Sequence, residues 1–236
     1  MTSHASRFPT LGDFFREFEN QTLRPNRLLL YLTEEDFQLF HRKGIYQPDY
    51  LELRVSENLG PAKKLIPALR DFPNQIIVTI DDDVIYSNNH LETLLAVSRK
   101  YPKNIIEGRA HLITLNDAEN PNLYSEWIPE VTCSNLESKL IFPTGVGMIL
   151  YPPNSLHPDV LDTITYLDLC PFQDDLWFYI HSNRNGTLNR VVQSEGKLEY
   201  LEGTQSAGLW ETVNSLGSND VALNRLLKKY TDIKFD

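Results

Sequence analysis

The sequence predicts an α/β fold in which a mostly parallel central sheet is flanked by helices. Strand-like and helix-like segments alternate over the first hundred residues, and such alternation is typical of parallel sheets covered on both faces. The chain has 236 residues, of which 41% are hydrophobic and 23% charged. This length and composition suit one globular domain with its own core. We therefore expect a single domain over residues 1–236.

The first elements follow from the spacing of apolar residues. Helical spacing predicts a helix over residues 10–21, and an unbroken apolar run predicts a buried strand over 27–32. Thr33 is expected to cap a second helix, because its hydroxyl can accept a hydrogen bond from the first turn. A further strand is expected over residues 51–55.

The central elements are a helix over residues 62–70, which Pro67 is expected to bend, and a strand over 75–80. The strand is apolar and β-branched almost throughout. A helix over 89–101 and a strand over 104–106 continue the alternation. Beyond residue 110, frequent prolines loosen the pattern, so the first half dominates the fold prediction.

Three consecutive carboxylates, Asp81, Asp82 and Asp83, follow the strand over 75–80. Ligands in open α/β sheets bind outside the carboxyl ends of the strands. Asp81 and Asp83 share one side of an extended segment, and their repulsion favours a hard divalent cation such as Mg²⁺ or Mn²⁺. A solvated loop, or a cluster that caps the following helix, is the alternative interpretation.

The segment LGPAKKLIPALRDFPNQIIVTIDDDVIY, residues 59–86, resembles the nucleotide-sugar-binding half of GT-A-fold glycosyltransferases, especially a bacterial family related to family 2. The resemblance implies that Asp81, with Asp82, contacts the nucleotide side of the donor. It implies that Asp83, together with Asp81, binds the metal that bridges the diphosphate. Lys63 or Lys64 would lie near the nucleotide, although a solvated helix face explains two lysines equally well.

The resemblance extends over nearly the whole chain and divides it into a nucleotide-sugar-binding half, residues 1–110, and an acceptor-side half, residues 111–236. It implies that Arg7 belongs to the nucleotide-base site and that Arg109 and His111 reach the diphosphate or sugar. A lone histidine is more often structural. Family members begin with an apolar strand, and this strand is expected to be missing ahead of Thr2.

On the acceptor side, Asp174 and Asp175 precede an aromatic-rich helix start. One carboxylate can cap that helix. The resemblance implies that the other removes the proton from the acceptor hydroxyl, which needs a general base, and Asp175 is preferred. Trp177 is expected in the core, or beneath an acceptor sugar. The resemblance implies that Trp210 and Asn214, with Asn219 and Asp220, form a lid or complete the acceptor side. Asn219 and Asp220 are better explained as the N-cap of a last helix over 221–230.

Charge and patterning limit the partners. With 22 basic and 32 acidic residues, the formal net charge of −10 argues against nucleic-acid binding. No apolar run reaches the ~20 residues of a transmembrane helix, and the first residues lack a signal-peptide pattern. The sequence therefore predicts a cytoplasmic protein, and leaves open a peripheral position at the inner membrane face.

The resemblance implies an inverting, metal-dependent hexosyltransferase of polysaccharide biosynthesis. Its donor would be a nucleotide sugar, with UDP favoured, its cofactor Mn²⁺ or Mg²⁺, and its acceptor an oligosaccharide or glycolipid. A non-catalytic nucleotide- or glycan-binding module of the same fold is the alternative. A sugar-1-phosphate nucleotidyltransferase would need a Gly-rich, basic loop near its start, which this sequence lacks.

Overall fold

The computed structural model describes residues 1–131, 136–192, 199–204 and 217–235, and this part of the chain has the mixed α/β class expected. The α-helices are α1 (Phe8–Phe18), α2 (Glu34–Lys43), α3 (Ile66–Asp71), α4 (His90–Lys100), α5 (Thr163–Leu169), α6 (Asp174–Arg184) and α8 (Ser218–Lys229). The strands are β1 (Leu28–Leu32), β2 (Leu51–Val55), β3 (Ile77–Thr79), β4 (Val84–Ile85), β5 (Ile105–Glu107), β6 (Ala110–Leu112), β7 (Glu137–Ser138), β8 (Ile141–Pro143), β9 (Ile149–Tyr151), β10 (Asn189–Val191) and β11 (Glu199–Tyr200). Short 3₁₀ turns include η1 (Ala5–Arg7), η2 (Gly60–Lys64), η4 (Gly145–Gly147) and η5 (Pro158–Leu161).

The central sheet has five strands in the order β3-β9-β5-β10-β7. Only β5 and β10 pair in parallel, and the other three pairings are antiparallel. Strand β9 runs opposite to both of its neighbours, β3 and β5. A mostly parallel sheet is therefore not confirmed, because this sheet is mixed.

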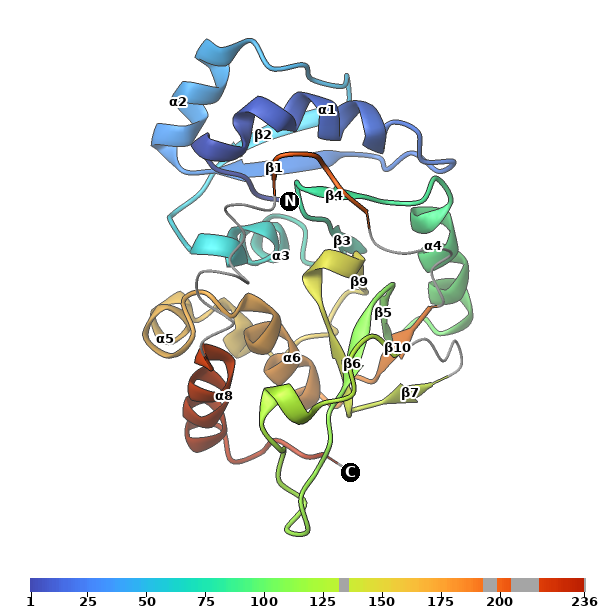
Figure 1. Cartoon of the computed structure of the whole chain (residues 1–236), viewed down its shortest axis with the longest axis vertical. Helices are drawn as coiled ribbons and strands as arrows, with labels where there is room; N and C mark the ends of the chain where they lie inside the picture. The colour runs from blue at the N-terminus through green and yellow to red at the C-terminus, as the bar shows by residue number, and fades with distance from the viewer. Residues whose placement is uncertain (132–135, 193–198, 205–216, 236) are drawn as a thin grey trace.

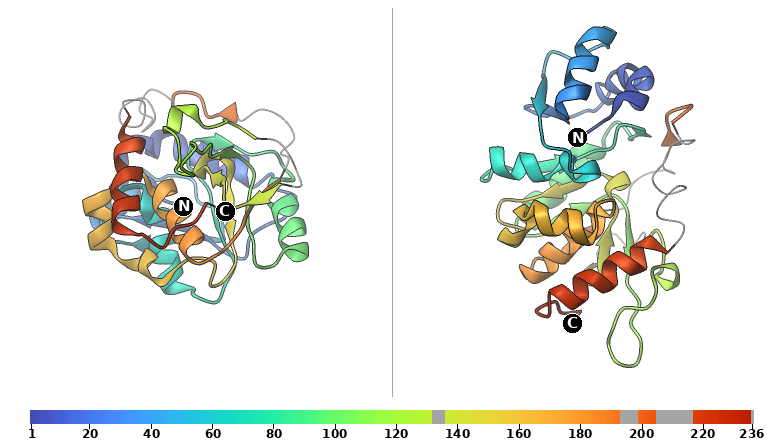
Figure 2. Two further views of the ribbon diagram at one scale, coloured as in Figure 1. Left: turned by 90° about the horizontal axis from the view of Figure 1, so that it is seen from below. Right: turned by 90° about the vertical axis from the view of Figure 1, so that its left-hand side faces the viewer.

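A second sheet pairs β1 and β2 in parallel, as the alternation of elements predicted. The start of the chain lies beside β1: the Tyr31 N–H donates to the Met1 carbonyl at 3.1 Å, and Thr2 forms a parallel bridge with Tyr31. Together with α1 and α2, this sheet forms one end of the molecule, and the C-terminus lies toward the other (Figures 1 and 2). Ahead of η1, the described strand pairing is limited to that bridge.

Consecutive side chains along the strands of the central sheet pack into two different apolar clusters. Ile105 and Tyr151 pack in a cluster with residues of α6 and α8, whereas Ile106 and Leu150 pack in another with residues of α1 and α4. Figure 1 shows α4 on one side of the sheet and α5, α6 and α8 on the other. This two-sided burial explains why the sequence of these strands is apolar at consecutive positions.

The first two strands match the sequence prediction, whereas α1 begins and ends earlier than the helix predicted over residues 10–21. Thr33 caps α2, and its hydroxyl accepts a hydrogen bond from the Asp36 N–H at 3.2 Å. The helix expected over residues 62–70 is instead divided into η2 and α3. Pro67 lies at the start of α3, where its fixed φ angle and missing N–H are tolerated. This division places Lys64 at the end of η2 with its side chain buried.

Among the described helices, none combines the length and apolar character that crossing a membrane requires.

Candidate active site

The acidic run lies immediately after β3, at the carboxyl end of that strand, and leads into β4. The backbone N–H of Asp81 donates to the hydroxyl of Tyr86 at 3.0 Å, and this hydrogen bond links the start of the loop to the residue after β4. The three carboxylates separate from this point. Asp81 points toward η2 and α6, whereas Asp82 and Asp83 contact the start of the chain.

Lys64 lies at the centre of the first group of carboxylates. Its Nζ atom is 3.1 Å from Oδ1 of Asp81, 3.1 Å from Oδ2 of Asp174 and 3.8 Å from Oδ1 of Asp175. The Lys64 side chain is only 7% exposed. The two acidic segments that the sequence singled out therefore meet at one buried ammonium group, which we call the Lys64 cluster (Lys64, Asp81, Asp174 and Asp175).

Asp174 and Asp175 are the first two residues of α6. No side-chain cap is formed by the residue before them, Gln173. The Oδ2 atom of Asp175 accepts the backbone N–H of Gly145 at 2.9 Å, so this carboxylate bonds to the turn η4. The Oδ1 atom of Asp175 is buried and has no hydrogen-bond donor within the described residues.

Asp82 and Asp83 each have a partner of their own. Ser3 donates its hydroxyl to Asp82, and NH2 of Arg7 lies 2.9 Å from Oδ2 of Asp83. The Arg7 side chain is 9% exposed, and NH1 of the same guanidinium is buried without a hydrogen-bond acceptor in the described part of the chain. Thus Arg7, expected at the nucleotide-base site, contacts the acidic run directly.

Burial and crowding raise the proton affinity of these carboxylates. Burial, followed by the Asp81 charge, raises the pKa of Asp83 to about 6, although Arg7 opposes the shift. Burial also raises the pKa of Asp175 to about 7, with Lys64 opposing the shift and Asp174 adding to it. Perturbed carboxyl groups of this kind are characteristic of functional sites, although structural networks produce them too.

For Lys64, the charges of its neighbours together have a larger effect on the pKa than burial does. Burial alone would lower the pKa of its ammonium, but Asp174, Asp81 and Asp175 outweigh this and raise it well above the usual value. Lys63 differs: its Nζ has one long hydrogen bond, 3.4 Å, to Oδ1 of Asn58, and burial lowers its pKa. The two adjacent lysines, which the sequence could not separate, therefore have different environments.

Arg109 and His111 lie beside the turn η4. The Arg109 guanidinium donates to Oγ1 of Thr144 at 2.9 Å and to Oε1 of Glu130 at 2.9 Å. His111 accepts the Glu130 N–H at Nδ1, 3.1 Å away, and burial, with Arg109, lowers the pKa of His111 to about 4. Its ring packs near Phe142. These contacts hold both side chains beside η4 and Glu130.

The contacts of Asp83 and Asp81 bear on their predicted role as metal ligands. Their carboxylate oxygens are the donor type that Mg²⁺ and Mn²⁺ prefer. Asp81 is paired with Lys64 and Asp83 with Arg7, and the described residues contain no group of three His, Cys, Asp or Glu side chains placed to hold a metal. Protein side chains alone thus form no closed metal site in this part of the chain.

Three further residues lie near the acidic residues. Ser3 and Gly145 contact the carboxylates directly. Tyr200 lies on β11, which pairs with β4, and the next residue donates its N–H to the Asp83 carbonyl at 2.9 Å. Tyr200 is 42% exposed. Nothing in the local sequence marks it, because strand pairing between distant segments brings it to the acidic run.

The remaining acceptor-side predictions have different outcomes. Trp177 is fully buried and donates its Nε1–H to the Val160 carbonyl, so it belongs to the core, as expected. Trp210 and Asn214 lie outside the described residues. Asp220 does not cap the last helix, because α8 already begins at Ser218 and the Asp220 carboxylate accepts the Tyr124 N–H at 2.7 Å.

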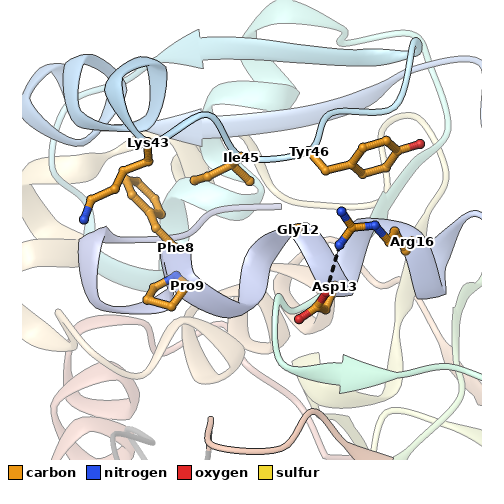
Figure 3. A pocket seen from close by; sticks show the side chains of 8 residues that line it. All are labelled: Phe8, Pro9, Gly12, Asp13, Arg16, Lys43, Ile45 and Tyr46. Atoms are coloured by element: carbon orange, nitrogen blue, oxygen red, sulfur yellow. Dashed lines mark hydrogen bonds and ion pairs between the residues drawn. The ribbon is translucent and has the colours of Figure 1, made fainter.

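A cavity of about 360 Å³ lies between α1 and the segment after α2 (Figure 3). Its wall includes the ion pair of Arg16 with Asp13, and the Arg16 guanidinium lies over the Tyr46 ring. None of the predicted site residues lines it. The lining residues are Phe8, Pro9, Gly12, Asp13, Arg16, Lys43, Ile45 and Tyr46.

No protein-family model matches this chain, and no curated protein matches it by sequence.

Proposed function

We propose that the chain is a glycosyltransferase of the GT-A type that moves a hexosyl group from a nucleotide sugar, with UDP favoured, to an oligosaccharide or glycolipid acceptor. The observation that carries the proposal is the meeting of Asp81 with Asp174 and Asp175 on Lys64. Two acidic segments with complementary chemical roles, far apart in the sequence, thus share one site beside the end of β3.

In the proposed reaction, Asp175 is the general base. Its Oδ1 atom has no hydrogen-bond donor in the described residues, whereas its Oδ2 atom is held by Gly145. Oδ1 takes the proton of the acceptor hydroxyl as that oxygen bonds to the anomeric carbon. The bond from this carbon to the diphosphate breaks, and the nucleoside diphosphate leaves with the electron pair. Attack opposite the leaving group inverts the anomeric centre.

The donor side is proposed at Asp81, Asp82, Asp83 and Arg7. A divalent ion needs only one or two protein carboxylates when substrate phosphates supply its other ligands. Mn²⁺ or Mg²⁺, when bound, neutralises charge on the leaving diphosphate. The Arg7 guanidinium has one buried donor, NH1, without a partner in the described residues, and a nucleotide oxygen is a suitable acceptor for it.

The first test is thermal unfolding of the purified protein with UDP, GDP or CMP, each with and without Mn²⁺. A ligand at about 100 times its Kd adds ~2.7 kcal/mol of stability. We expect one nucleotide to stabilise the wild-type protein only with Mn²⁺, and Asp83→Ala to remove the shift. If no nucleotide stabilises the protein under any condition, the proposal is wrong.

A second test separates an enzyme from a non-catalytic module of the same fold. Asp175→Asn keeps the side-chain shape and removes the base, so it should retain nucleotide binding and lose turnover of the donor by about 10²-fold or more. A wild-type protein that binds the nucleotide but transfers no sugar to any acceptor, and hydrolyses no donor, would favour the binding module.

A further inference from the structure

The ammonium of Lys64 is shared among carboxylates from two separate elements. We propose that Lys64 is a positioning residue that fastens the start of α6 to the acidic run after β3 and so fixes the direction of the Asp175 carboxylate. This inference rests on the proposed function, because it takes Asp175 as the base. It assigns Lys64 a task different from direct contact with the nucleotide.

The Lys64 ammonium donates a hydrogen bond to Oδ1 of Asp81 at 3.1 Å, and its contacts with Asp174 and Asp175 are ion pairs. An ammonium has three N–H donors, and three carboxylates surround the Nζ atom, at 3.1 Å (Asp81), 3.1 Å (Asp174) and 3.8 Å (Asp175). The Lys64 side chain is almost entirely buried. Because these carboxylates surround a buried Nζ atom, the ammonium acts between protein groups.

The turn η4 gives Asp175 its second point of attachment. The Gly145 N–H donates to Oδ2 of Asp175 at 2.9 Å. A Cβ atom at Gly145 would lie 2.3 Å from Lys64 Nζ and 2.9 Å from Asp175 Oδ1. The turn therefore packs directly against the ion pairs, and no side chain fits between them. The turn holds Oδ2 through a hydrogen bond, and the Lys64 ammonium lies 3.8 Å from Oδ1, so the carboxylate is constrained on two sides.

The position of Lys64 along the chain makes it an effective link. It ends η2, which contacts α3 and β1, while Asp81 follows β3 and Asp174 begins α6. The side chain of Lys64 thus joins η2 to the end of β3 and to the start of α6. A change at Lys64 would disturb the distance between the proposed donor and acceptor sides without touching either substrate.

The test compares the wild-type protein with Lys64→Met and Lys64→Arg. Lys103→Met, at an exposed lysine of the loop before β5, is the control. Hydrolysis of UDP-glucose, UDP-galactose and GDP-mannose with Mn²⁺ is measured as separate kcat and KM values. We expect Lys64→Met to lower kcat at least tenfold with less than a threefold change in KM. Lys64→Arg should recover part of the loss, and Lys103→Met should match the wild type.

A second readout needs no activity. Urea unfolding midpoints are measured for Lys64→Met, for Asp174→Asn and for the double variant. Residues that share an ion pair give non-additive effects, so the double variant should unfold at a clearly higher urea concentration than the two single shifts predict. Additive shifts would show that Lys64 does not hold Asp174, and the inference would be wrong.

The two readouts separate this inference from the proposed function. If the wild type neither binds a nucleotide nor hydrolyses a donor, the proposed function fails, and a non-additive cycle still supports Lys64 as the link between the elements. If the wild type is active and Lys64→Met has the kcat of Lys103→Met, the positioning role is wrong and the proposed function stands.

Discussion

Asp82 and Asp83 are held by residues near the start of the chain, one partner for each carboxylate, whereas Asp81, Asp174 and Asp175 share a single ammonium. In the first arrangement, each carboxylate has its own partner, a hydroxyl for Asp82 and a guanidinium for Asp83. The second concentrates three carboxylates around one cation in a buried place, so its charges are unbalanced. Burial is the main cause of both raised pKa values, about 7 for Asp175 and about 6 for Asp83, and neighbouring carboxylates add to each.

This difference shows how much a buried network depends on one residue. A separate pair loses one interaction when a partner is removed, while removal of Lys64 takes the cation from three carboxylates at once. Burying unpaired charge is more costly than losing an exposed pair. The predictions below test this contrast, beginning with the largest expected effect.

Removal of the shared cation should cost more stability than removal of the separate one. Lys64→Met leaves buried carboxylates without a cation, and we expect a loss of about 3–5 kcal/mol. Arg7→Met removes a charged hydrogen bond to one carboxylate, and we expect about 1.5–3 kcal/mol. Urea unfolding at pH 7.5 measures both. Lys63→Met, at a buried lysine with one long hydrogen bond, is the control and should cost less than Lys64→Met.

Equal losses for Lys64→Met and Arg7→Met would contradict the contrast between a shared and a separate cation.

The packing of η4 against the Lys64 cluster should make Gly145 intolerant of a side chain. Gly145→Ala places a methyl group 2.3 Å from Lys64 Nζ, and overpacking of this kind costs about 1–3 kcal/mol. Gly12→Ala is the control, because its methyl group meets no atom closer than 3.6 Å and lies within α1. That change should stabilise the protein by about 0.5–1 kcal/mol. Thermal unfolding compares the two, and a neutral Gly145→Ala would show that the turn is free to move.

The raised pKa of Asp175 should make stability depend on pH. An acid whose folded pKa is about 7, against ~3.9 when unfolded, contributes stability below pH ~4 that is lost as the pH rises through 7. Asp175→Asn cannot ionise, so at pH 8 it should be more stable than the wild type by on the order of 1 kcal/mol. Asp83→Asn should show a smaller gain, complete by about pH 6. Urea unfolding from pH 4 to 8 tests this, and the absence of any gain at pH 8 would contradict the burial of an ionised Asp175.

Removal of an exposed ion pair should cause the smallest loss of stability. Arg24 and Asp49 form a salt bridge in which both side chains are more than half exposed, and such pairs contribute about 0–1 kcal/mol. Arg24→Gln should therefore shift the urea midpoint only slightly. A loss as large as that of Arg7→Met would mean that burial does not explain the difference between the site and the surface.

Much of the fold was predictable because local patterns are strong in the first half. The apolar runs of β1 and β3, the alternation with helices, and the Thr33 cap all depend on neighbouring residues. The direction of β9 was not predictable in this way. It depends on which strands the segment pairs with after η4, and strand pairing between distant segments leaves no local signal.

The candidate site was also predictable only in its local features. The sequence by itself determined that acidic residues follow a buried strand and begin a later helix, because these are properties of adjacent positions. The tertiary structure alone decided that Asp81 and Asp175 face the same ammonium, that Lys64 and not Lys63 supplies it, and that Ser3 and Tyr200 lie beside the acidic run. The physical reason is that proximity between separate elements results from packing of the whole chain, which short-range periodicity does not encode.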